Sequence, residues 1–133
     1  VLLNLVLNAS DALLEGGGEV RVATRVVRTD GRPSVEGGWS EPPPRGRYAL
    51  LSVEDDGIGM PPDVQARIFE PFFTTKPTGQ GTGLGLPLCQ GIVEAHGSRI
   101  EVSSKLGCGA EFSFALPVQA AFSALAGTAH RTE

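Results

Sequence analysis

The stretch "VEDDGIGMP" at residues 53–61 decides how this chain is interpreted. An apolar run ends in two carboxylates, Asp55 and Asp56, and then Gly57 and Gly59 bracket one isoleucine. Asp-Gly pairs are common turn signals, so a plain turn is one explanation. The alternative is a ligand site at a strand end, because a carboxylate accepts hydrogen bonds from an amine and glycines leave room for a flat ring. In that interpretation Asp56 faces the ligand, while Asp55 points to the opposite side and is structural.

Length and composition set the first limits on function. The 133 residues, 41% hydrophobic and 20% charged, predict one globular domain. The net charge of -4 without a basic patch argues against nucleic-acid binding, and no apolar run approaches the roughly 20 residues of a membrane helix. Cys89 and Cys108 lie among apolar residues and glycines, which is typical of reduced packing thiols and favours a cytoplasmic location.

The pattern of apolar residues and breakers predicts three helices and four strands. Helical spacing covers residues 1–15, 63–70 and 84–97, and β-type runs cover 19–27, 48–54, 99–104 and 110–117. A Gly- and Pro-rich hairpin loop at 28–46, to which no chemistry is assigned, separates the first two strands, and a second irregular segment at 71–83 forms a flap. This order predicts an α+β fold: a two-layer sandwich with one mixed sheet, helices on one face, and the other face largely open to solvent or a partner.

The ends of the chain lie outside this pattern. The opening "VLLNLVLNAS" lacks the basic region and cleavage site of a signal peptide and is typical of the inside of a helix, so we expect a domain that is truncated at its N-terminus. The weakly patterned residues 118–133 are predicted to be a tail or linker. The domain itself is therefore expected to span residues 1–117.

The segment "GTGLGL" at residues 81–86 opens the last predicted helix. Its members are Gly81, Thr82, Gly83, Leu84, Gly85 and Leu86. Bare N–H groups at a helix N-terminus bind phosphate, assisted by the helix dipole. The spacing matches neither a P-loop nor a Rossmann fingerprint, and most glycine-rich loops bind nothing.

A polar stripe runs along the first predicted helix. Its members, Asn4, Asn8, Asp11 and Glu15, are separated by steps of four, three and four residues. An amide oxygen such as that of Asn8 is a suitable Mg²⁺ ligand when phosphates and waters supply the other oxygens. For any single Asn a local hydrogen bond is the commoner role, and Asp11 and Glu15 either hold metal-bound waters or are solvated.

Taken together, these motifs resemble the catalytic and ATP-binding domain of sensor histidine kinases, in the GHKL superfamily. "NLVLNASDA" resembles the N box, "DDGIGM" the G1 box, "IFEPFFTTK" the F box and "GTGLGL" the G2 box, in the family's order over residues 1 to about 117. The resemblance implies a Bergerat fold that binds ATP and Mg²⁺.

The resemblance also implies roles for individual residues. Asn8 would bind Mg²⁺, with Asn4 and Asp11 facing the same cleft. Asp56 would bind adenine against Gly57 and Gly59, residues 81–85 would surround the phosphates, and Lys76 would meet the terminal phosphates. Phe69, Phe72 and Phe73 either hinge the lid and meet the helix that carries the phosphoacceptor or are ordinary core residues.

Two departures from the family pattern bear on activity. Ala110 stands where the family often has Thr, which removes a hydroxyl that helps to hold adenine and is expected to lower its affinity. Asn4 stands where hydrolysing relatives have Glu, and an amide cannot act as a general base for water. Transfer to another nucleophile depends mostly on positioning and charge, so it stays available.

The expected function is transfer of the ATP γ-phosphoryl group to a histidine on a dimerisation domain of the same protein, with a response regulator downstream. His96 and His130 are not expected to be that acceptor. The alternatives are a hydrolysing ATPase of the gyrase, MutL or chaperone kind, or a degenerate interaction module. The isolated fragment is expected to be a monomer that binds nucleotide without phosphorylating itself, and the full-length protein a homodimer, soluble or anchored with this domain in the cytoplasm.

Overall fold

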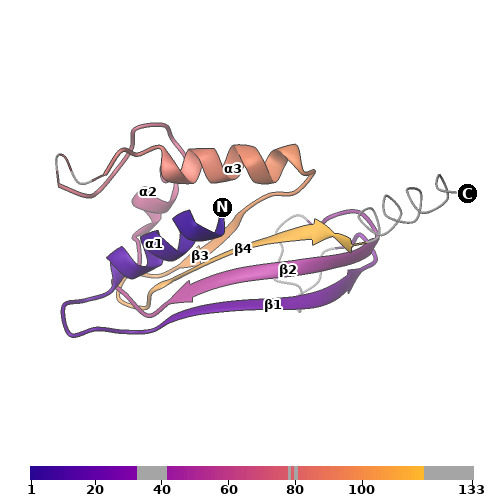
Figure 1. The fold of residues 1–133 in the computed structure, drawn as a ribbon, viewed down its shortest axis with the longest axis horizontal. Helices are drawn as coiled ribbons and strands as arrows, with labels where there is room; N and C mark the ends of the chain where they lie inside the picture. The colour runs from indigo at the N-terminus through magenta and orange to yellow at the C-terminus, as the bar shows by residue number, and fades with distance from the viewer. Residues whose placement is uncertain (33–41, 78, 80, 119–133) are drawn as a thin grey trace, which may run out of the picture.

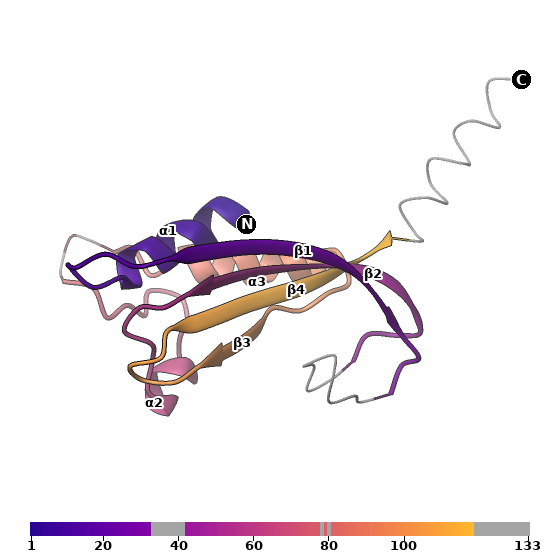
Figure 2. The same ribbon diagram turned by 90° about the horizontal axis from the view of Figure 1, so that it is seen from below.

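The computed structural model of the chain describes residues 1–32, 42–77, 79 and 81–118. The elements follow the order α1 (Leu2–Ala12), β1 (Val20–Thr29), β2 (Gly46–Asp55), α2 (Pro62–Gln65), α3 (Gly85–Ala95), β3 (Glu101–Ser104) and β4 (Ala110–Pro117). The helices pack on one face of the sheet, which confirms the two-layer α+β sandwich (Figures 1 and 2).

The sheet has the strand order β1-β2-β4-β3. Every strand pair among the described residues is antiparallel, so the expected mixed sheet is corrected. The β1–β2 and β3–β4 pairs join consecutive strands. The long connection through α2 and α3 leads from β2 to the edge strand β3, and β4 then returns between them, antiparallel to β2.

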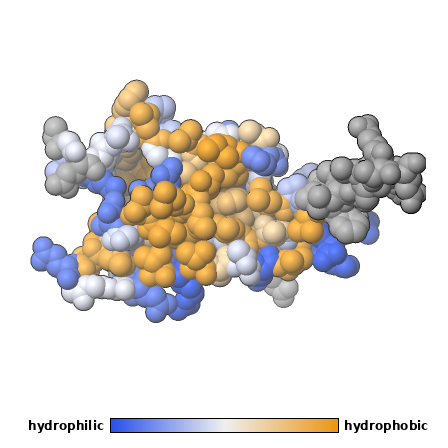
Figure 3. Space-filling view, in the orientation of Figure 1, coloured by the Kyte–Doolittle hydropathy of each residue, from blue (hydrophilic) through white to orange (hydrophobic). Residues whose placement is uncertain are grey.

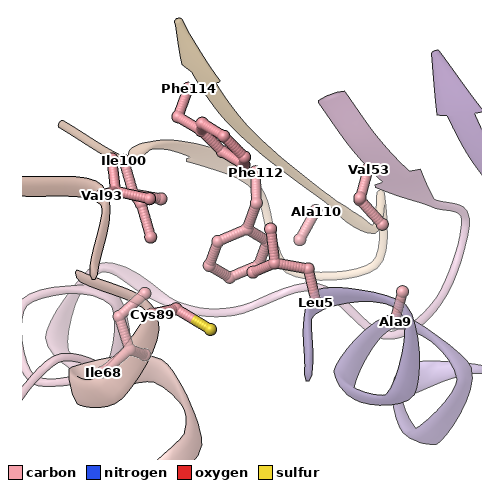
Figure 4. Packing of buried hydrophobic residues seen from close by; sticks show 10 residues of the cluster. All are labelled: Leu5, Ala9, Val53, Ile68, Cys89, Val93, Ile100, Ala110, Phe112 and Phe114. Carbon is pink, nitrogen blue, oxygen red and sulfur yellow. The ribbon is translucent and has the colours of Figure 1, made fainter. Parts of the chain in front are cut away.

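The core lies between the sheet and the helices α1 and α3. Leu5 and Ala9 of α1 point toward Val53 and Phe112 of the sheet (Figure 4). Cys89, which has no exposed surface, and Val93 bring α3 onto the same cluster. Burial of the larger of these side chains, the leucine, valines and phenylalanine, contributes roughly 1.5–3 kcal/mol each, so this cluster fixes both helices against the sheet.

Local signals explain where the helices end. The glycines at 16–18 follow α1. Helix α3 ends at Ala95 with His96 as its C-cap, and Gly97 follows with a φ of 75°, which suits glycine. The Ser98 N–H then donates to the Val93 carbonyl at 3.1 Å. The helix predicted over 63–70 is shorter than expected: α2 ends at Gln65, and turns follow it.

The opposite face of the sheet is only partly open. Tyr48, Leu50 and Ala115 form a small buried cluster there, with Val27 beside it. The Tyr48 hydroxyl donates to the Pro44 carbonyl at 2.7 Å. The prediction of a face largely open to solvent or a partner therefore needs a correction only at this end of the sheet, where these side chains are buried.

Exposed apolar side chains are frequent on the helical layer, and Figure 3 shows apolar surface gathered over it. Leu3 and Leu7 of α1 and Leu88 of α3 are each more than half exposed. Within the described residues no helix combines the length and the apolar content needed to cross a membrane. Both cysteines are free; Cys89 is a packing thiol as predicted, whereas Cys108 is exposed.

Candidate nucleotide site

Asp55 is the last residue of β2 and faces the helical layer. It alternates with Val53, a residue of the core, so both side chains lie on the same face of the sheet. Among the described residues it is the one buried polar or charged side chain, at 5% exposure. Its strand partner is Ala110 of β4, directly opposite. A carboxylate is thus held between the two layers, beside Ala110, the position at which the sequence resemblance led us to expect a Thr.

The charge state of Asp55 depends on opposing influences. Burial raises the pKa of this carboxyl above its ordinary value, and the backbone N–H groups of Gly57 and Ala110 act against that rise. The Gly57 N–H donates to Oδ1 at 2.9 Å. An incoming N–H donor would also favour the ionised form, because a hydrogen bond to a carboxylate stabilises its charge.

Asp56 does not occupy the place that the sequence predicts. Its side chain is exposed, and Oδ1 accepts a hydrogen bond from the Glu19 N–H at 2.9 Å. The Asp56 N–H donates to the Glu19 carbonyl at 3.3 Å, so the residue fastens the start of β1. The two acids point in the opposite directions to those expected. Asp55 continues the alternation of β2 and so points to the same side as Val53, toward the helices. That alternation from Val53 was the sequence signal that identifies Asp55.

Gly57 and Gly59 pack closely against the protein's own backbone. A Cβ on Gly57 would overlap the Ala12 carbonyl at the end of α1. A Cβ on Gly59, whose φ is 68°, would overlap the Lys105 carbonyl in the β3–β4 turn. Short contacts of the backbone with α1 and this turn therefore require both glycines, whether or not a ring lies beside them.

Three of the four residues of the predicted polar stripe lie within α1. Asn4 and Asn8 are half-buried, one turn apart, and Asp11 is exposed in the last turn. The ammonium of Lys76, from the connection between α2 and α3, lies 2.6 Å from Asp11 Oδ2. Glu15 lies beyond the end of the helix and is exposed. The structure thus brings together the N box and the lysine of the flap.

The start of the G2 box lies against the same lysine. A Cβ on Gly81 would stand 3.1 Å from Lys76 Cδ and 2.8 Å from Thr74 Oγ1. Thr82 turns its hydroxyl to accept the Leu84 N–H at 3.2 Å, just before α3 begins. The stem of Lys76 therefore lies beside Gly81, the first glycine before α3, while its ammonium pairs with Asp11 of α1.

The N-terminus of α3 is bare. Leu84 is its N-cap, no side chain of the described residues caps it, and its first turn holds no acid. A Cβ on Gly85 would meet nothing within 4 Å, unlike one on Gly83, which would overlap the Phe72 backbone. Packing therefore does not account for glycine at 85, where open space lies next to backbone N–H groups.

The three phenylalanines of the F box behave differently. Phe69 and Phe73 pack against the core, and the Arg67 guanidinium lies 4.5 Å from the centroid of the Phe73 ring. Phe72 is 74% exposed, has a φ of 68°, and donates its N–H to the Gly83 carbonyl at 2.9 Å. A bulky side chain with positive φ is strained, and such strain is concentrated at functional positions.

No metal cage exists in the part of the chain that the structure describes. Its residues contain no group of three or more His, Cys, Asp or Glu that could hold an ion. The amide oxygen of Asn8 alone would be a poor site. Mg²⁺ commonly takes one or two protein oxygens together with waters and substrate phosphates, so the donors present fit the ion only with a nucleotide.

Comparison with known proteins places the chain in a family. Residues 1–120 match the family HATPase_c, described as histidine kinase-, DNA gyrase B- and HSP90-like ATPases. The chain belongs to the HATPase_c family. The four sequence motifs that predicted this membership all lie within the matched residues, and so does Asp55, which the sequence-based site prediction had treated as structural.

The similar HATPase_c proteins include sensor kinases. Sensor kinase CckA of Brucella abortus is 41% identical over 117 residues, which are 88% of this chain and 12% of CckA. Signal transduction histidine-protein kinase AtoS of Escherichia coli is 38% identical over 118 residues, 89% of this chain and 16% of AtoS. The chain thus spans less than a fifth of the length of both relatives.

Solved HATPase_c structures share the fold. Full-length ShkA in complex with AMPPNP is 34% identical with a TM-score of 0.61, covering 87% of this chain and 20% of ShkA. The nucleotide-free catalytic domain of histidine kinase ThkA is 32% identical with a TM-score of 0.60, covering 87% of this chain and 62% of that one. The Bergerat-type architecture that the motifs implied is confirmed.

Proposed function

We propose that residues 1–117 form the ATP·Mg²⁺-binding catalytic domain of a sensor histidine kinase. It donates the γ-phosphoryl group to a histidine on a dimerisation domain of the same protein, which then supplies a response regulator. Residues 118–133 are a tail or linker, of which all but residue 118 lie outside the described residues. The domain acts on the cytoplasmic side, as a monomer in isolation and as part of a homodimer in the full protein.

The observation that carries this proposal is the placement of Asp55. It is a buried acid at a strand end, in a family whose name refers to ATPases, and no cation of the described residues pairs with it. Backbone N–H groups of Gly57 and Ala110 donate to this carboxylate, but no cation within the described part of the chain neutralises it. Because a buried charge is costly, a further donor would stabilise it, and the exocyclic amine of adenine is such a donor. We therefore assign adenine recognition to Asp55 instead of Asp56.

The phosphate end of the nucleotide fits the other elements. The N-terminus of α3, which no side chain of the described residues caps, offers N–H groups from Gly85 onward to phosphate oxygens. The aliphatic stem of Lys76 lies beside Gly81, ahead of this terminus, and its ammonium is held by Asp11. When bound, Mg²⁺ neutralises charge on the phosphates. Asn8 would supply its protein oxygen, and Asn4, one turn away, would hydrogen-bond to a bound water.

Transfer is favoured over hydrolysis. Asn4 occupies the position one turn before Asn8, and an amide cannot take a proton from water. We assign no acceptor role to His96, the C-cap of α3, whose ring Nδ1 lies 2.8 Å from the Ile92 carbonyl and fixes the ring at the helix end. His130 lies outside the described residues. Phe72, exposed and strained, presents its ring to the helix that carries the acceptor.

The proposal is tested by phosphoryl transfer in two components. The chain is incubated with γ-labelled ATP, alone and with a separately produced dimerisation domain of the same protein. We expect label on that domain only and slow release of free phosphate. Label on the chain alone, or rapid phosphate release without acceptor, would contradict the assignment.

The adenine assignment is tested by a matched pair of variants. Asp55→Asn should weaken binding of a fluorescent ATP analogue at least about tenfold, because the amide presents a donor where the adenine amine needs an acceptor. Asp56→Asn should leave the titration nearly unchanged. The opposite result would restore Asp56 as the adenine ligand.

A further inference from the structure

One ion pair joins two motifs that lie far apart in the sequence. Lys76 Nζ and Asp11 Oδ2 are 2.6 Å apart and 65 residues distant along the chain. Both side chains keep part of their surface in solvent, 37% for Lys76 and 55% for Asp11. The pair connects α1 to the connection between α2 and α3, which lies on the side of the molecule where α1 ends (Figure 1).

The position of Asp11 makes it a competitor for the lysine. It stands one turn after Asn8 in the last turn of α1. The aliphatic stem of Lys76 lies beside Gly81, on the approach to α3, because a Cβ on that glycine would stand 3.1 Å from Lys76 Cδ. A cation near the C-terminal end of a helix is favoured by the helix dipole, and α1 has no basic residue of its own in that turn. The carboxylate therefore holds the ammonium at the place where the proposed phosphate site begins.

We infer that Asp11 is an internal substitute for the nucleotide phosphates, a latch that holds Lys76 in the nucleotide-free chain and releases it to a triphosphate. The inference rests on the proposed function. A carboxylate and a phosphate compete for one ammonium, so each triphosphate that binds must break the Asp11–Lys76 pair. Nucleotides without β- and γ-phosphates leave the pair intact.

The expected effect is a selective gain in affinity. Asp11→Asn keeps the size of the side chain and removes its charge. Because exposed ion pairs are weak, the variant should bind a non-hydrolysable ATP analogue with Mg²⁺ about two- to fivefold more tightly, with AMP binding unchanged. In a Lys76→Gln background the same substitution should have no effect, since the lysine is no longer there to be released.

The experiment is calorimetric titration of the whole chain and four variants: Asp11→Asn, Lys76→Gln, the double variant, and Glu15→Gln. The last is the matched control, because it removes the same charge from an exposed residue beyond the end of α1. It should leave both affinities unchanged. A selective gain for Asp11→Asn that disappears in the double variant supports the latch.

Each other outcome overturns it. Weaker triphosphate binding by Asp11→Asn would make Asp11 a helper of Mg²⁺, and unchanged binding would make the pair incidental. An equal gain for Glu15→Gln would reduce the effect to net charge. Failure of the unaltered chain to bind any nucleotide would refute the proposed function itself, whereas normal binding without the gain refutes only the latch.

Discussion

Asp55, the proposed adenine ligand, also has an energetic cost to the fold. Burial raises its pKa, so the folded chain keeps this proton to a higher pH than the unfolded chain does. The unfolded state then binds fewer protons across that interval, and stability falls as pH rises through the folded-state pKa. The favourable contribution is complete only below the ordinary pKa of an aspartate.

A pH series tests this sign. We expect the free energy of unfolding of Asp55→Asn, relative to the unaltered chain, to improve as pH rises from about 4 to about 7, because the amide carries no charge to bury. Urea denaturation at each pH measures it. Asp56→Asn is the control, since its side chain is exposed, and its difference from the unaltered chain should not follow the same trend. A flat difference for Asp55→Asn would show that its carboxyl is not perturbed.

Ala110 offers a second test at a single position, because it lies opposite Asp55 on the same face. Ala110→Thr should tighten adenine nucleotide binding by about 0.5–1.5 kcal/mol, the typical net value of one added hydrogen bond. Ala110→Val has nearly the same shape without the hydroxyl and is the control. Equal affinities for the two variants, measured by calorimetry, would remove the hydroxyl from the explanation.

At the scale of elements, the loop after β2 connects three parts of the fold. The Ile58 N–H donates to the Ala12 carbonyl at 3.0 Å, and its carbonyl accepts the Gly107 N–H at 2.7 Å. The Met60 N–H donates to Ser104 Oγ at 2.9 Å. The end of α1, the end of β2 and the β3–β4 turn are therefore one unit.

Substitution of the loop glycines should damage this unit. Gly57→Ala and Gly59→Ala should each lower the free energy of unfolding by about 2 kcal/mol or more, because the new methyl groups overlap backbone that cannot move aside. Gly91→Ala is the control: it lies in α3 with nothing within 4 Å of its Cβ, and alanine should stabilise that helix by about 0.5–1 kcal/mol. Denaturant unfolding measures all three. Loop variants as stable as the unaltered chain would contradict the packing.

The sequence predicted these elements well where a single period governed them. The strand at 110–117 was located to the residue, and the helices α1 and α3 to within three residues of either end. The sequence-based prediction failed where tertiary contacts determine the structure. No local pattern indicates that β4 pairs antiparallel with β2, or that the helix ends at Gln65. The choice between Asp55 and Asp56 failed for another reason: turn chemistry outweighed the alternation of the strand.

For the whole molecule, the small number of metal-binding side chains predicts that Mg²⁺ binding depends on bound nucleotide. Because the described residues hold no metal cage, Mg²⁺ alone should not change the melting temperature. A non-hydrolysable ATP analogue with Mg²⁺ at about 100 times its Kd should stabilise the chain by roughly 2.7 kcal/mol. Removal of Mg²⁺ by a chelator should abolish most of that shift, since the phosphate charge is then left unneutralised. Thermal unfolding in the four combinations tests it, and a shift with Mg²⁺ alone would reveal a separate metal site.

The tight passage of residues 57–59 past two carbonyl groups also affects how related sequences are interpreted. A related protein that no longer binds nucleotide would still need glycine at both positions, because a side chain there would overlap the neighbouring backbone. The two glycines of this motif therefore indicate only that the backbone passes close to other backbone here. Only the acid before them indicates a purine ligand.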